Sequence, residues 1–381
     1  MKKLLLLLVL SVLAISCTTY ETPPTVFPNK SPEVVKGIKG VWVTNVASSA
    51  LNSLANIKET VQICKKSAMT DIYVVVWNKG RTIYPSDIMK NEFGIPIAEN
   101  FAGRDPLLEM ITEAHKEKIK VHAWFEYGFS SWNNTVPGAD VILDKYPQWA
   151  ARDVNKAILV SGGGFRWMNG INPDVQKFMI SLVLEVVKKY DVDGVQGDDR
   201  LPAMPVKGGY DDYTVQLYKT ENGGASPPAN ENTTAWIDWR TNKLTNFFGD
   251  LYKAVKAVKP KVIVSSSPSV FPFGKTNYLQ DWPTWLDKKY CDYVIPQIYR
   301  YDFPAYQATL KSQIALIKNS GDRTKFYAGV LIQAGTWNSS NEYVNQMVNE
   351  NRANGVGGDC FFFYEGLKFN SEYFTKIYPT K

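Results

Sequence analysis

The chain has 381 residues, a formal net charge of +6 at pH 7, two histidines and four cysteines. Its basic residues form no cluster, so we expect no nucleic-acid partner. Two histidines argue against a Ser-His-Asp hydrolase and against a histidine-rich metal site. The aromatic content is high, with 11 Trp and 21 Tyr, but such side chains fill cores as readily as they stack on sugars.

The N-terminal segment is predicted to lie outside the fold. Two lysines precede an apolar run over 4–13 that is too short to span a bilayer, and small residues then lead to Cys17. A cysteine there resembles the lipobox of bacterial lipoproteins, although Ala14 stands where leucine is usual. We therefore predict a lipoprotein-type signal peptide over 1–17, lipidation of Cys17 and a polar tether over 18–37. The protein is expected in the cell envelope, facing the periplasm or the outer surface, with the lipid anchor as its sole contact with the membrane.

From residue 38 onward, apolar β-rich runs alternate with segments of helical period. Eight such runs are predicted as strands, at 40–46, 71–78, 120–128, 194–199, 262–268, 293–300, 326–332 and 359–365. Eightfold strand-helix alternation predicts a (β/α)8 TIM-type barrel over 38–381. A doubly wound open sheet is the alternative, but it would show a Gly-rich turn after its first strand, and 46–50 reads VASSA.

Helix start signals and long loops support the barrel. Asn172 followed by Pro173, and Ser340, are typical of helix N-termini, and a long helical stretch ends before Pro260. The longest insertions, 133–169 and 201–233, follow the third and fourth strands. Loops after strands lie at the end of the barrel where enzymes of this architecture keep their sites.

Two adjacent carboxylates end the fourth strand, in the segment DGVQGDDR over 193–200. Side chains two apart share a face of a strand, so Gln196 and Asp198 are predicted to point into the barrel. We interpret Asp198 as a nucleophile or electrostatic stabiliser and Asp199 as its support. Bulges are common at strand ends, so both remain candidate catalytic residues. Calcium held by the pair is a lesser alternative, because other ligand types are scarce; we expect no cofactor and no metal.

Glycoside hydrolysis needs a second carboxyl group that can hold a proton. Glu126 is predicted to face inward beside Trp124, where an apolar wall would raise its pKa. Asp281 lies in the loop after the fifth strand, between aromatic residues suited to a sugar. Asp302 and Glu365 are weaker candidates, because Asp302 follows its strand at some distance and strand parity disfavours Glu365.

Candidate substrate-binding side chains are those that follow the strand ends. They are Asn45, Trp77, Asn78, Trp124, Arg200, Trp282, Gln297, Tyr299 and Tyr364. Four of them are predicted as aromatic platforms for sugar rings, namely Trp77, Trp282, Tyr299 and Tyr364.

Several segments together resemble glycosyl hydrolase-like family 10, a family of exported bacterial proteins distinct from the xylanases that share the number. They include GVWVTN at 40–45, VVWNKG at 75–80, DGVQGDD at 193–199, YLQDWPTW at 278–285 and QIYR at 297–300. The resemblance runs from about residue 38 to 365. It implies a TIM-type barrel, a carbohydrate substrate and hydrolase chemistry. In a related branch, activity on peptidoglycan glycan strands stripped of their peptides is described.

The chain departs from the family pattern at two positions in the 193–200 segment. Gly197 stands where a bulky apolar residue is expected, and Arg200 stands where relatives often have His or an aromatic residue. Neither departure removes a carboxylate, but both alter the wall of the pocket.

Two functions fit these observations. The first is an exported glycoside hydrolase that cleaves a peptidoglycan glycan strand or another polysaccharide. The second is a non-catalytic, glycan-binding surface lipoprotein on the same barrel, which is favoured by the lack of one unambiguous acid partner for Asp198.

Overall fold

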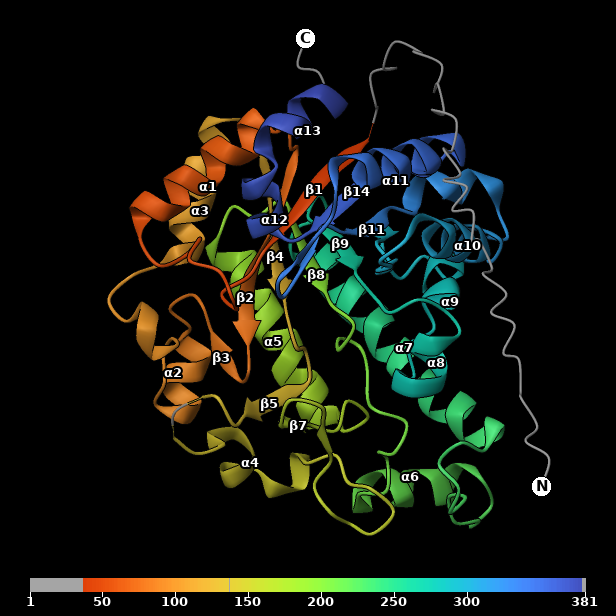
Figure 1. The fold of residues 1–381 in the computed structure, drawn as a ribbon. Coiled ribbons are helices and arrows are strands. Elements are labelled where there is room, and N and C mark those ends of the chain that lie inside the picture. The colour runs from red at the N-terminus through yellow and green to blue at the C-terminus, as the bar shows by residue number, and fades with distance from the viewer. Residues whose placement is uncertain (1–36, 137, 379–381) are drawn as a thin grey trace, which may run out of the picture. The chain divides into compact units, whose positions relative to one another are not determined.

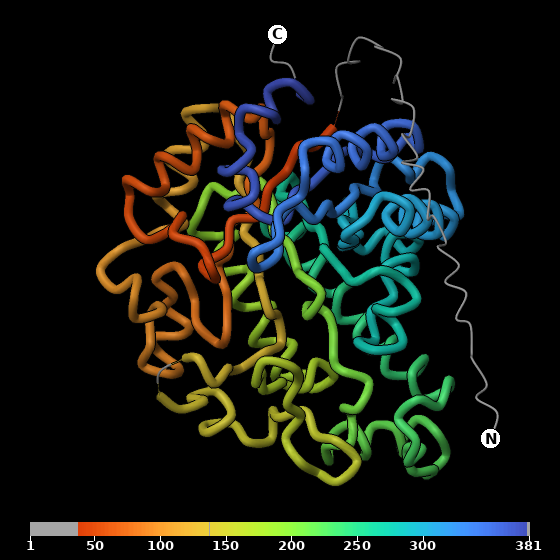
Figure 2. Tube along the Cα trace, viewed as in Figure 1, coloured from red at the N-terminus to blue at the C-terminus, as the bar shows by residue number. Residues whose placement is uncertain are grey.

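The computed structural model describes residues 37–136 and 138–378, and within them eight parallel strands form a barrel (Figures 1 and 2). The hydrogen-bonded order is β10-β9-β8-β4-β2-β1-β14-β11. Isolated parallel bridges from Val294 to Phe326 and from Gln297 to Gly329 join the two end strands. The sheet therefore closes on itself, and the predicted (β/α)8 fold is confirmed. The predicted signal peptide and Cys17 lie outside the described residues.

Each barrel strand overlaps one predicted run, and most are shorter than predicted. They are β1 (Ile38–Val43), β2 (Asp71–Asn78), β4 (Lys120–Phe125), β8 (Gly194–Gly197), β9 (Ile263–Ser266), β10 (Tyr293–Val294), β11 (Ala328–Leu331) and β14 (Gly358–Phe362). Strands of a barrel are covered by helices outside and by side chains inside, which explains why all of β2 is buried.

The outer layer consists of one or two helices after each strand (Figure 1). They are α1 (Leu54–Lys66), α3 (Pro106–Lys116), α5 (Pro173–Lys189), α7 (Thr234–Val258), α8 (Phe273–Tyr278), α9 (Trp282–Asp287), α10 (Phe303–Ile314), α11 (Asn341–Ala353), α12 (Tyr364–Phe369) and α13 (Ser371–Ile377). The predicted helix starts are confirmed. Asn172 caps α5 through Asp174 N, and Ser340 caps α11 through Tyr343 N.

The remaining elements lie in the loops that follow the strands. They are β3 (Arg81–Thr82), α2 (Asp87–Phe93) and η1 (Glu99–Phe101) after β2; β5 (Ser130–Asn133), α4 (Val141–Lys145), η2 (Pro147–Trp149), β6 (Val160–Ser161) and β7 (Phe165–Trp167) after β4; α6 (Asp212–Glu221) after β8; η3 (Ser320–Lys325) after β10; and β12 (Gln333–Ala334) and β13 (Trp337–Asn338) after β11. Figure 1 shows α2, α4, β5, β7 and α6 at the same end of the barrel. The long insertions thus surround one mouth, as predicted.

The interior of the barrel is packed with large side chains from facing strands. Trp42 Nε1 donates to Gln196 Oε1 at 2.7 Å, and the hydroxyls of Tyr73 and Tyr293 lie 2.8 Å apart. The His122 ring stacks on Tyr73 with 4.5 Å between ring centroids. His122 therefore points inward, and the predicted inward orientation of Gln196 is confirmed. A filled interior leaves the mouth as the place for a site.

No helix within the described ranges is long and apolar enough to cross a membrane. Cys64, Cys291 and Cys360 are each buried and free.

Candidate active site

Glu126 follows β4 and lies at the barrel mouth with 6% of its surface exposed. Thr44 Oγ1 and Asn78 Nδ2 both donate to its Oε2, at 2.9 and 2.7 Å, and no described residue donates to Oε1. Burial raises the pKa of Glu126 to about 7, against the opposing effects of these donors and of Arg200. Glu126 is therefore a carboxyl group that holds a proton near neutral pH, with one oxygen anchored and the other free.

A bulge in β2 brings Asn78 to Glu126. Strict alternation along β2 would point Trp77 into the barrel, but the register against β4 shifts between Val75 and Trp77. Trp77 instead packs against Phe178 of α5, with ring centroids 6.1 Å apart. Because neighbouring side chains point to opposite faces, Asn78 turns towards the mouth and Trp77 joins the core.

Asp198 is 1% exposed, and both of its carboxylate oxygens accept bonds from main-chain amides. Tyr127 N donates to Oδ2 at 2.6 Å and Arg200 N donates to Oδ1 at 2.8 Å. Burial, with the neighbouring charge of Asp199, raises the pKa of Asp198. The Asp198 side chain therefore stabilises the loop after β8 through Arg200 N and connects this loop to the end of β4 through Tyr127 N.

Asp199 is the more accessible member of the pair, with a side chain 20% exposed. Arg200 Nη1 donates to its Oδ1 at 2.8 Å, and the guanidinium carbon lies 4.4 Å from the centre of the Tyr127 ring. Burial is the main cause of the raised pKa of Glu126, and the charge of Asp199 adds to it. Burial likewise raises the pKa of Tyr299, again with a contribution from Asp199. The charge of Asp199 therefore acts on both groups in the mouth.

The contacts of the pair differ from those that strand parity predicted, in which Asp198 faced the substrate and Asp199 supported it. The last residue of β8 is Gly197, so the alternation of a strand no longer applies to the two acids. In the loop, Asp198 turns to main-chain amides and Asp199 remains more exposed.

Gly197, one of the two departures from the family pattern, is required by this loop. A Cβ at Gly197 would lie 2.2 Å from Leu201 O, because the chain folds back over the strand end. A bulky residue does not fit here. The other departure, Arg200, provides the cation that pairs with Asp199.

Three of the four predicted aromatic platforms are buried. Trp77 and Trp282 are 0% exposed and Tyr364 is 1% exposed. The Trp77 indole donates to Gly128 O at 2.8 Å, and Trp282 contacts Phe326. Such burial argues against sugar stacking by these side chains.

The fourth platform and two polar candidates lie in or near the mouth. Tyr299 is half-buried and contacts Phe362, with 5.2 Å between ring centroids. Asn45 Oδ1 accepts from Asn78 Nδ2 at 3.0 Å, while Gln297 Nε2 donates to Ser267 O at 3.1 Å. Trp124 is 3% exposed and lies deeper, against Trp42 in the barrel interior.

The other candidate acids take part in local structure. Asp281 caps α9 by accepting from Thr284 N at 3.3 Å, and its carboxylate lies 3.7 Å from Lys275 Nζ. Asp302 caps α10, and Glu365 accepts from Ser48 Oγ at 2.7 Å. The structure brings Glu126, Asp198 and Asp199 together and leaves these three acids outside that cluster.

Sequence reasoning missed several aromatic residues at the mouth. Tyr127 and Phe165 stack with 4.2 Å between ring centroids, and Tyr127 lies under Arg200. Tyr301 is 64% exposed and contacts Trp337, with 5.0 Å between ring centroids. The run QIYRYD, in which two tyrosines follow the sixth strand, is the signal that would have indicated Tyr301.

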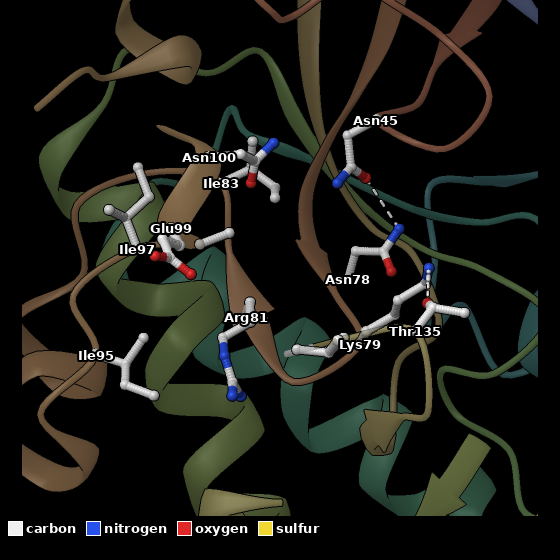
Figure 3. Close-up of a pocket in the computed structure, with 12 residues that line it drawn as sticks. Asn45, Asn78, Lys79, Arg81, Ile83, Ile95, Ile97, Glu99, Asn100 and Thr135 are labelled. Carbon is white, nitrogen blue, oxygen red and sulfur yellow. Dashed lines mark hydrogen bonds between the residues drawn. The ribbon is translucent and has the colours of Figure 1, made fainter. Parts of the chain in front are cut away.

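A cavity of about 680 Å³ opens beside Asn45 and Asn78 (Figure 3). Its lining consists of Asn45, Asn78, Lys79, Arg81, Ile83, Ile95, Ile97, Ala98, Glu99, Asn100, Thr135 and Val136. Through Asn78 the cavity adjoins Glu126. A second, smaller pocket of about 280 Å³ includes Gln297 and Arg300. Among the described residues, no group of three or more His, Cys, Asp or Glu side chains is arranged to hold a metal ion.

Comparisons with solved structures support the barrel. The glycoside hydrolase domain of PgaB (BpsB) from Bordetella bronchiseptica aligns with a TM-score of 0.66 at 13% identity, covering 91% of this chain and 99% of that one. The catalytic domain of a β-amylase from Paenibacillus polymyxa aligns with a TM-score of 0.64 at 10% identity, again over 91% and 99%. At such identities the likeness concerns the fold alone.

Sequence comparisons identify the family. The glycosyl hydrolase DigH of Escherichia coli K12 is 28% identical over 380 residues, covering 85% of this chain and 81% of the relative. The glycosyl hydrolase YngK of Bacillus subtilis 168 is 25% identical over 378 residues, covering 87% and 69%. The profile of the family described as Glycosyl hydrolase-like 10 matches residues 37–340. The chain therefore belongs to the glycosyl hydrolase-like 10 family, which confirms the resemblance that its motifs indicated.

Proposed function

We propose that this protein is a glycoside hydrolase that cleaves a glycan at the barrel mouth. The observation that carries the proposal is the buried Glu126 carboxyl at the barrel mouth, which Thr44 and Asn78 hold by one oxygen and whose pKa burial raises to about 7. Glycosidases need one protonated and one ionised carboxyl group on either side of the scissile bond. A peptidoglycan glycan strand or another polysaccharide is the proposed substrate.

Glu126 is the proposed general acid. Thr44 and Asn78 hold its Oε2, so a proton on Oε1 would be directed at the glycosidic oxygen. Near neutral pH a group with this pKa is divided between both forms, which suits proton transfer to the leaving group. When the bond breaks, its electrons pass to the glycosidic oxygen as that oxygen accepts the proton. A water molecule would then bond to the anomeric carbon and lose a proton, which completes the hydrolysis and restores the acid.

Asp199 is the proposed stabiliser of the positive charge that develops on the sugar. Its side chain is 20% exposed, whereas that of Asp198 is 1% exposed, and its charge contributes to the raised pKa of Glu126. Arg200, which pairs with Asp199 and lies on the Tyr127 ring, would hold the carboxylate in position. Asp198 would support both by fixing the loop through two main-chain amides.

The glycan chain would cross the mouth from the β2 side to the β10 side. In the closed ring of eight strands, β2 and β10 are four strands apart and therefore opposite each other. The large cavity follows β2, and Gln297, Tyr299 and Tyr301 follow β10. Exposed Tyr301, with Trp337 behind it, is a suitable platform for a sugar ring.

The test is release of reducing ends from purified glycans. We expect activity on at least one carbohydrate polymer and its loss in Glu126→Gln. Binding to a glycan without turnover by the wild-type protein, unaffected by Asp199→Asn, would instead support the alternative of a non-catalytic glycan-binding protein. Export and lipidation at Cys17 remain proposals from the sequence of 1–17. Metabolic labelling with a fatty-acid analogue that disappears in Cys17→Ala would support them.

A further inference from the structure

A tight hairpin places Arg81 next to Asn78, the residue that donates to the candidate acid. Lys79 and Gly80 form the two-residue turn between β2 and β3, with φ of 53° and 73°, as such turns require. The register of the hairpin pairs Arg81 directly with Asn78, so both side chains leave the same face. Because Asn78 donates to Glu126, Arg81 lies one side chain further from the reacting centre, in the wall of the large cavity.

The hairpin cannot easily move away from this position. A Cβ on Gly80 would lie 1.8 Å from Ser131 O, so the turn packs directly against the backbone of β5. The side chain of Arg81 is therefore presented to the cavity from a fixed backbone.

The Arg81 guanidinium is nearly buried and lacks an ionic partner. Only 8% of the residue is exposed, and the guanidinium donates to Gly80 O at 3.0 Å. Among the described residues, no carboxylate oxygen lies within 4.0 Å of it. Asp140, whose charge acts on Arg81 from further away, already accepts from Ser131 Oγ and Leu143 N. A buried charge without a partner is unfavourable, and a bound anion would relieve that cost.

The rest of the cavity suits an acidic sugar. Lys79, a second cation, lines the same space and donates from Nζ to Thr135 Oγ1 at 2.8 Å. The one acid in the lining, Glu99, is exposed to solvent, and its carboxylate forms no ion pair with Arg81. Isoleucine side chains at positions 83, 95 and 97 form an apolar part of the wall, against which the C–H face of a sugar ring can pack.

We propose that this cavity is a subsite for a carboxylate-bearing sugar of the glycan, with Arg81 as the group that binds the carboxylate. The inference rests on the proposed glycan function and adds the chemical class of the substrate. Two sources share this chemistry: a hexuronic acid, with the carboxylate on the ring, and an amino sugar with a free lactyl ether. A planar guanidinium binds either carboxylate through two parallel hydrogen bonds.

The experiment measures binding by calorimetry in the Glu126→Gln protein, so that hydrolysis does not interfere. One arm uses oligosaccharides that contain hexuronic acid, and the other uses peptide-free oligosaccharides that contain N-acetylmuramic acid. Each is compared with the same oligosaccharide after chemical reduction of its carboxylates to alcohols. We expect the carboxylate form of one arm to bind roughly 10- to 100-fold more tightly than its reduced form.

Variants assign that difference to Arg81. Adding Arg81→Gln should remove the preference, so that both forms bind equally weakly, and Arg81→Lys should retain part of it. The matched control is Lys90→Gln, which removes an exposed cation of α2 outside the cavity and should leave the preference unchanged. Thermal unfolding of each variant identifies any that fail to fold, in which case Arg81→Lys carries the comparison.

Equal binding of carboxylate and reduced forms in both arms, with Arg81 intact, would overturn the subsite. So would a preference that survives Arg81→Gln. These outcomes are distinct from failure of the proposed function. A protein that prefers the carboxylate form without cleaving it keeps the subsite and loses the hydrolase, and cleavage without preference does the reverse.

Discussion

Asn78 Nδ2 donates to Glu126 Oε2 at 2.7 Å, which links the strand that borders the large cavity to the candidate acid. Thr44 donates to the same oxygen, so two neutral donors hold a buried carboxyl group by one side. This arrangement fixes the side chain without neutralising it through an ion pair. Burial therefore remains the main influence on its pKa.

Glu126→Gln is expected to lower the rate of glycan cleavage by about 10²- to 10⁴-fold, because glutamine cannot donate the proton. The amide oxygen can still accept from Thr44 and Asn78, so the melting temperature should change little. Reducing-end assays and thermal unfolding measure the two effects. A glycoside with a strongly acidic leaving group should lose much less activity, since it needs no proton. The exposed Glu342→Gln serves as the control and should retain wild-type activity.

Substitution of the two aspartates should affect different properties, namely activity for Asp199 and stability for Asp198. Asp199→Asn is expected to reduce activity on the order of 10²- to 10³-fold, with unfolding free energy within about 1 kcal/mol of wild type. Asp198→Asn should lower stability by about 1–3 kcal/mol, because two main-chain N–H groups would meet an amide that has one acceptor oxygen. Steady-state kinetics and urea unfolding measure both. An active Asp199→Asn, alongside a stable and inactive Asp198→Asn, would restore the assignment that strand parity favours.

The pH dependence of activity should follow Glu126. Because its pKa is raised to about 7, the rate of cleavage is expected to fall as the pH rises through that value and the acid loses its proton. Initial rates across the pH range, measured with saturating substrate, give the profile. A rate that stays level well above pH 7 would exclude Glu126 as the acid.

The free energy of unfolding should also depend on pH through Glu126, and it should fall as the pH rises. Between the usual value of 4.5 and about 7, the unfolded chain releases the Glu126 proton while the folded protein keeps it. The free energy of unfolding of the wild type, relative to Glu126→Gln, should therefore fall by roughly 3 kcal/mol as pH rises across this window, and then level off. Urea unfolding at a series of pH values measures the difference. A constant or rising difference would contradict the raised pKa.

Gly197→Ala tests the loop that holds the aspartates. The added methyl group would lie 2.2 Å from Leu201 O, so the loop must shift and carry Asp198 and Asp199 with it. We expect lower stability by about 1–3 kcal/mol together with reduced activity. Gly162→Ala, where a Cβ meets nothing within 4 Å, is the matched control. A fully active, fully stable Gly197→Ala protein would show that the loop tolerates the family's bulkier residue.

The sequence by itself determined the barrel, because period-2 and period-3.6 patterns are local properties that repeat eight times along the chain. It also placed Glu126, Asp198 and Asp199 at strand ends, and these do lie together. The inward position of Gln196, which lies within a regular strand, followed correctly from alternation.

Only the tertiary structure decided which groups the side chains at the strand ends contact. A bulge in β2 moved Trp77 into the core and turned Asn78 to the mouth, and neither consequence is visible in the local pattern. The end of β8 at Gly197 released Asp198 and Asp199 from strand parity. Arg81 became a candidate only because the hairpin pairs it with Asn78 in the wall of the cavity, with no carboxylate within salt-bridge distance among the described residues. Side chains alternate between the two faces of a strand only as far as its ladder hydrogen bonds continue. The candidate functional side chains lie just beyond that point, where alternation no longer predicts their direction.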